Sequence, residues 1–128
     1  MSTIMIIDDD PEHAEMLTFC LTNSGHSVVW AGEWREAQKK LADVKPDLFI
    51  LDYNMPGFTG KQIYDMLQGS DRTRAKPTIF LTAAYRIPEN ISLGAKTKFM
   101  RKPVDLKYLQ VHVKAMLPPD AAGPPSTP

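Results

Sequence analysis

The stretch "LFILDYNMPG" (residues 48–57) decides the fold of this chain. An apolar run leads to an ionisable carboxylate, Asp52, and the chain then turns through Met55, Pro56 and Gly57. Such a nearly continuous apolar run is typical of a strand covered on both faces, as in a parallel sheet. Asp52 either caps the turn that follows or stands at the strand end to do chemistry. The rest of the sequence bears on this choice.

The composition predicts a single domain without a strong overall charge. A chain of 128 residues fits one domain, and its 15 Lys and Arg balance its 15 Asp and Glu. No global field therefore attracts nucleic acid or an anionic membrane.

The only cysteine, Cys20, excludes an intramolecular disulfide and suits a reducing compartment. With no signal-like segment and no apolar stretch near the roughly 20 residues that span a bilayer, we expect a cytoplasmic domain.

Strand-like and helix-like segments alternate along the chain. The predicted strands are residues 3–8, 27–31, 47–52, 77–82 and 98–101. Between and after them, apolar residues recur at helical spacing in four stripes: Ala14, Leu17 and Leu21; Trp34, Ala37 and Leu41; Ile63, Met66 and Leu67; and Leu106, Leu109, Val113 and Met116. This alternation predicts a doubly wound α/β domain with a parallel sheet and right-handed crossovers.

Two segments depart from the regular alternation. Between the strands at 77–82 and 98–101, Pro88 and Gly94 leave room for only a short helix. Residues 118–128 hold five prolines and one glycine among eleven residues, which predicts a disordered tail or a linker to a further domain. We therefore expect the folded domain to cover residues 1–117.

Ionisable side chains follow the carboxyl ends of the predicted strands. Asp8 and Asp9 follow the first strand, and Asp52 ends the third. In an open α/β sheet the site lies at this edge, so neighbouring first and third strands would bring the three carboxylates together. Carboxylates this close raise one another's pKa unless a cation compensates. Oxygen ligands without His or Cys suit Mg²⁺ or Mn²⁺ rather than Zn²⁺.

A lysine and a hydroxyl lie at the same predicted edge. Lys102 follows the fifth strand and can reach an anion, and Thr82 and the N–H of Ala83 are further donors. Metal, lysine and hydroxyl around one aspartate describe a site for phosphoryl transfer, in which a carboxylate is an accepted nucleophile. Each residue also has an ordinary reading: Asp9 or Asp10 as a helix cap, and Lys102 as part of an exposed turn. Their convergence at one sheet edge favours the functional reading.

The ordered motifs "IIDDD", "LFILDYNMPGFTG", "IFLTA" and "KFMRKP" resemble those of response-regulator receiver domains, the phospho-accepting part of two-component signalling. The resemblance covers residues 3–117. It implies a flavodoxin-like fold, with five parallel strands in the order 2-1-3-4-5 and helices on both faces. We expect a receiver of the single-domain type, and the short spacing between Thr82 and Gly94 further suggests a short fourth helix.

The resemblance also assigns the metal site. It makes Asp52 the phosphorylated residue, and it makes Asp9 a direct ligand of Mg²⁺. Asp8 would act mostly through a metal-bound water, and Asn54 would supply its backbone carbonyl.

A second group of residues would respond to the phosphoryl group. Thr82 matches the family's switch hydroxyl, with the N–H of Ala83 beside it, and Lys102 matches the lysine that pairs with phosphate. Phe99 matches the switch aromatic, and the bond before Pro103 is cis in the family.

The implied function is that of a signalling switch rather than an enzyme. A histidine kinase or histidine phosphotransfer protein would donate the phosphoryl group, and the domain would catalyse only its own phosphorylation and dephosphorylation. The output would be contact with an unknown downstream protein, as a monomer or a phosphorylation-dependent dimer, and not direct contact with nucleic acid or membrane. One alternative is an interaction module that works without phosphorylation. Another is a phosphoester hydrolase, which would need an Asp-x-Asp motif and a cap insertion, whereas Asp52 is followed by Tyr53 and Asn54.

Overall fold

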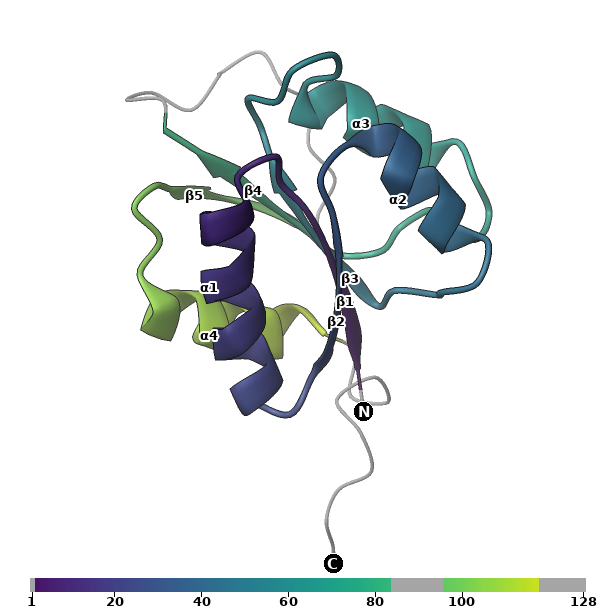
Figure 1. Cartoon of the computed structure of the whole chain (residues 1–128). Helices are drawn as coiled ribbons and strands as arrows, with labels where there is room; N and C mark the ends of the chain where they lie inside the picture. Colours follow the sequence, from purple (N-terminus) through teal and green to yellow (C-terminus); the bar gives the residue numbers. More distant parts are fainter. Residues whose placement is uncertain (1, 84–95, 118–128) are drawn as a thin grey trace, which may run out of the picture.

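The computed structural model describes residues 2–83 and 96–117, and within them it shows a five-stranded parallel sheet with helices (Figure 1). The strands are β1 (Thr3–Ile7), β2 (Ser27–Ala31), β3 (Leu48–Asp52), β4 (Thr78–Thr82) and β5 (Thr97–Arg101). The helices are α1 (Pro11–Asn23), α2 (Trp34–Leu41), α3 (Gly60–Gln68) and α4 (Leu106–Met116). The strand order is β2-β1-β3-β4-β5, which confirms the predicted topology.

Helices cover both faces of the sheet, as predicted. Helices α1 and α4 pack on one face, and α2 and α3 pack on the other (Figure 1). Because successive side chains of a strand point to opposite faces, Ile4 and Ile6 of β1 join the first layer while Met5 and Ile7 join the second. Strands β3 and β4 are buried along their whole length. The apolar run that opened the sequence is therefore a central strand.

Side-chain capping marks the first residues of α1 and α4. The side chain of Asp10 accepts hydrogen bonds from the N–H groups of Glu12 and His13, and Pro11 occupies the first turn of α1. Asp105 caps α4 in the same way. Of the two aspartates considered as caps of the first helix, the structure uses Asp10, which leaves Asp9 available for another role.

The predicted strands differ from the observed ones by a single residue at four ends. β1 ends at Ile7, and β3 and β4 begin at Leu48 and Thr78, whereas β5 already begins at Thr97. Asp47, predicted to open β3, instead accepts a hydrogen bond from the N–H of Thr3 through its carboxylate, at 2.8 Å. The predicted short helix after Thr82 and the predicted tail at 118–128 lie outside the described residues. No helix in the described part of the chain has the length and apolar character needed to cross a membrane.

Candidate functional site

Three carboxylates meet at the carboxyl ends of β1 and β3. The two strands are neighbours in parallel register, with Ile7 opposite Leu51, so the residues that follow lie side by side. One carboxylate oxygen from each of Asp8, Asp9 and Asp52 lies within 4.8 Å of the others. Asp8 and Asp52 are buried, and Asp9 is exposed. The sequence predicts that these three carboxylates converge, and in the structure they do.

Asp52 sits between this acidic cluster and a lysine. Its Oδ2 lies 3.2 Å from Nζ of Lys102, and its Oδ1 accepts a hydrogen bond from the N–H of Asn54 at 3.2 Å. Burial raises the pKa of Asp52 above its ordinary value; the N–H of Asn54 and the charge of Lys102 lower it, while the charge of Asp8 raises it further. The net direction is upward. The carboxylate is thus held in an environment that disfavours its own negative charge.

The order of the strands brings Lys102 to this point. β4 lies between β3 and β5, and the N–H of Lys102 donates to the carbonyl of Thr82 at 2.8 Å. The peptide bond between Lys102 and Pro103 is cis. Val104, which follows, is buried against α1 and α4 and anchors the loop.

Thr82 and Asn54 contact each other beside Asp52. The Thr82 side chain is fully buried, and its hydroxyl donates to Oδ1 of Asn54 at 3.2 Å. Ala83, the next residue, is exposed. A side-chain role for Asn54 was not predicted, since the resemblance assigned only its backbone carbonyl.

Phe99 packs inward on β5. Its ring is stacked on Phe80, with centroids 4.9 Å apart, and tilted against Tyr53 at 5.5 Å. Tyr53 directly follows Asp52 in the chain, so the Phe99 ring contacts the residue next to the predicted phosphorylation site.

Two aromatic nitrogens near Asp8 were missed by the sequence reading. Nδ1 of His13 lies 2.5 Å from Oδ2 of Asp8, and Nε1 of Trp30 donates to the backbone carbonyl of Asp8 at 2.8 Å. His13 could have been found, because side chains in the first turn of a helix point toward its N-terminus, where Asp8 lies.

A glycine shapes the loop after Asp52. A Cβ added to Gly60 would lie 2.8 Å from Cα of Tyr53 and 3.2 Å from the carbonyl oxygen of Asp52. The N–H of Gly60 also donates to the carbonyl of Tyr53 at 2.8 Å. The first residue of α3 thus lies directly against the end of β3, and only glycine fits this approach.

The arrangement suits a divalent cation next to a transferable anion. Oxygen ligands from carboxylates are what Mg²⁺ prefers, usually with several waters retained, so the donor set of Asp8, Asp9 and Asp52 fits this ion. Added negative charge at Asp52 would need donors, and Nζ of Lys102 lies 3.2 Å from Oδ2 of Asp52 while the hydroxyl of Thr82 bonds the neighbouring Asn54.

Comparison with known proteins identifies a family whose motifs the sequence resembles. The family model described as "Response regulator receiver domain" matches residues 4–114. The DNA-binding dual master transcriptional regulator RpaA of Synechocystis is 31% identical over 120 residues, covering 91% of this chain and 49% of the relative. The chain spans about half the length of the curated relatives it matches.

Solved structures agree with the sequence matches. The chemotaxis protein CheY4 of Vibrio cholerae superimposes with a TM-score of 0.83 at 26% identity, covering 91% of this chain and 99% of CheY4. The response regulator TrrA of Thermotoga maritima, solved in complex with Mg²⁺-BeF, has a TM-score of 0.80 at 29% identity, covering 91% and 100% of the two chains. The chain therefore belongs to the receiver-domain family of response regulators, a class of signalling domains in two-component systems.

Proposed function

We propose that this chain accepts a phosphoryl group on Asp52, in a Mg²⁺-dependent transfer from a histidine kinase or a histidine phosphotransfer protein of a two-component system or phosphorelay. The observation that carries the proposal is the position of the buried Asp52 carboxylate, between Nζ of Lys102 at 3.2 Å and the carboxylates of Asp8 and Asp9. We further propose that the protein acts in the cytoplasm.

The transfer is a displacement at phosphorus. An oxygen of the Asp52 carboxylate bonds to phosphorus while the phosphorus–nitrogen bond to the donor's histidine breaks, and the electron pair of that bond stays on the imidazole. Asp8, Asp9 and Asp52 would hold a cation that would supply charge neutralisation for the transferring group. Lys102 would add a second positive charge, 3.2 Å from Oδ2 of Asp52.

Asp8 and Asp9 are proposed to hold the metal in different ways. Asp9 is exposed and free to ligate directly. Asp8 is buried, and both of its oxygens already have partners: Oδ1 accepts from the N–H of Asp10 at 2.9 Å and Oδ2 contacts His13. This supports an action of Asp8 through a metal-bound water. The backbone carbonyl of Asn54 completes the proposed ligands from the protein, and Mn²⁺ shares the same donor preference.

The proposed switch starts at Thr82. Its hydroxyl, which bonds Asn54 in this structure, would turn to an oxygen of the phosphoryl group, together with the N–H of Ala83. A phosphoryl group adds about −1.5 to −2 charges, which would shift a pre-existing equilibrium of the domain. The ring of Phe99, packed on Phe80 and Tyr53, would report that shift to the surface read by a downstream protein.

Phosphorylation by a small donor tests the proposal. The chain is incubated with acetyl phosphate and Mg²⁺, and intact mass is measured for wild type and Asp52→Asn, with parallel samples containing Mn²⁺ or a chelator. We expect a hydroxylamine-sensitive gain of one phosphoryl group on the wild type only, lost with the chelator. No gain on the wild type, or an equal gain on the variant, would reject the proposal and favour a module that works without phosphorylation.

A further inference from the structure

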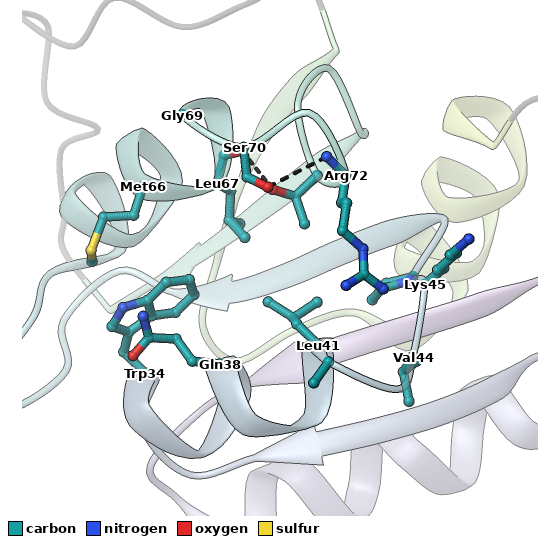
Figure 2. A pocket seen from close by; sticks show the side chains of 13 residues that line it. Trp34, Gln38, Leu41, Val44, Lys45, Met66, Leu67, Gly69, Ser70 and Arg72 are labelled. Carbon is teal, nitrogen blue, oxygen red and sulfur yellow. Dashed lines mark hydrogen bonds between the residues drawn. The ribbon is translucent and has the colours of Figure 1, made fainter.

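A hollow of about 440 Å³ lies between α2 and α3, away from the carboxylate site (Figure 2). It is lined in part by the segments that follow the two helices and lead into β3 and β4, including Lys45 and Arg72. These segments lie at the amino ends of the strands, whereas Asp52 lies at a carboxyl end. The hollow is therefore separate from the proposed phosphorylation site, and its volume is in the range of known ligand sites.

One end of the hollow is apolar. Trp34 and Leu67 line the hollow and are themselves buried, at 8% and 2% exposure. Leu41 and Met66 are only partly buried and line the same hollow. Covering apolar side chains that remain partly in water is favourable, by about 25 cal/mol per Å² of apolar surface removed from water. This end favours an apolar group.

The other end carries two positive charges. In Figure 2, Arg72 and Lys45 lie at the opposite end of the hollow from Trp34 and Met66. None of the residues that line the hollow is acidic. Neither Lys45 nor Arg72 forms an ion pair among residues 2–83 and 96–117, whereas their neighbour Arg74 is paired with Asp71 at 3.2 Å. This end favours an anion, in a chain whose overall charge is balanced.

We propose that this hollow docks an acidic segment of a partner protein. The segment would place an aromatic or long aliphatic side chain against Trp34 and Met66, and a carboxylate between Lys45 and Arg72. Both cations are exposed on loops, so they fit the rim of a protein interface, where charges steer and select partners, better than an enclosed site for a small anion. The docking depends on neither the metal nor the phosphoryl group at Asp52.

Short peptides test the docking site. The ¹⁵N-labelled chain is titrated with three blocked peptides and followed by NMR: Phe-Leu-Gly-Asp-Glu, its neutral counterpart Phe-Leu-Gly-Asn-Gln, and Gly-Gly-Gly-Asp-Glu, which lacks the apolar anchor. We expect the first to shift amides around Gln38, Leu41 and Gly69 and to bind at least about tenfold more tightly than the other two, which corresponds to about 1.4 kcal/mol. Its affinity should fall as salt is raised.

Charge reversal at the rim supplies the matched control. The double variant Lys45→Glu, Arg72→Glu should lose binding of the acidic peptide. The double variant Lys107→Glu, Lys114→Glu makes the same change in net charge on α4, across the sheet, and should keep it. An equal loss in both variants would overturn the proposal, as would equal affinity for the acidic and neutral peptides, shifts confined to other surfaces, or no binding. Binding of 4-phenylbutyrate but of no peptide would replace the protein segment by a small amphipathic anion and would likewise overturn it.

Discussion

Nζ of Lys102 lies 3.2 Å from Oδ2 of Asp52, although 50 positions of sequence separate the two residues. The contact depends on β4 pairing with β3 on one side and β5 on the other. It places a positive charge against a carboxylate that also belongs to the acidic cluster with Asp8 and Asp9, so that the lysine and a cation held by the cluster would act on the same anion.

Replacing Lys102 by Met removes the charge of the lysine, and its effects on Mg²⁺ binding and on phosphorylation should be opposite. Without the lysine the site is more negative, so we expect Mg²⁺ to bind about threefold to tenfold more tightly, measured by titration. Phosphorylation by acetyl phosphate should slow by about 10²-fold or more, because the charge that stabilises the transferring group is gone. Lys107→Met, at an exposed position of α4, is the control and should change neither quantity. Weaker Mg²⁺ binding in Lys102→Met would contradict the expectation that the positive charge of Lys102 disfavours binding of the cation.

The raised pKa of Asp52 predicts a pH-dependent stability. Below its ordinary value of 3.8 both folded and unfolded states are protonated and Asp52 contributes nothing. As the pH rises, the unfolded state ionises first, and above the raised folded pKa the buried charge destabilises the fold. In metal-free buffer at pH 7, Asp52→Asn should therefore raise the unfolding temperature, by several degrees for each kcal/mol.

The pH dependence of this difference is the sharper measurement. The gain in Asp52→Asn should shrink as the pH falls through the folded pKa toward 3.8, as followed by urea unfolding at several pH values. Asp43→Asn, at an exposed position after α2, should show little gain at any pH. A variant less stable than wild type at pH 7 would show that Lys102 and Asn54 outweigh burial.

Gly60→Ala should damage the site through the backbone. The new Cβ would lie 2.8 Å from Cα of Tyr53, so α3 or the loop after Asp52 must shift. We expect a loss of about 1–3 kcal/mol in unfolding free energy and slower phosphorylation. Gly69→Ala is the matched control: its Cβ would come no closer than 3.4 Å to Met66, and its φ of −80° is ordinary. Equal effects of the two substitutions would reject the close approach as the cause.

Trp30→Phe should loosen the turn that carries Asp8 and Asp9. The phenyl ring keeps most of the packing but removes the N–H that bonds the carbonyl of Asp8 at 2.8 Å. The expected loss is about 0.5–1.5 kcal/mol of stability and a several-fold weaker affinity for Mg²⁺, followed by urea unfolding and by titration. Phe19→Ala removes an exposed ring on α1 away from this turn and should leave the Mg²⁺ affinity unchanged. If Mg²⁺ affinity is also unchanged in Trp30→Phe, the hydrogen bond serves stability alone.

Much of the fold could be predicted because it is encoded by near neighbours in the chain. The apolar run at Leu48–Leu51 identified a strand buried on both faces, and Asp10, one of two aspartates considered as a helix cap, caps α1 in the structure. The four motifs at successive strand ends identified the edge of the sheet where the carboxylates meet. Periodicity and capping act over a few residues, so they can be read without knowing the rest of the structure.

The contacts within the site were decided by tertiary structure. That the indole of Trp30 bonds the carbonyl of Asp8, and that the Asn54 side chain accepts from Thr82, depends on strand register and rotamers. The hollow between α2 and α3 likewise exists only because two loops distant in sequence place Lys45 and Arg72 around the same space as Trp34, at its opposite end. The sequence by itself determined which residues stand at the strand ends. Only the packing of the elements determined which atoms touch, because distances between side chains far apart in the chain are set by the whole fold.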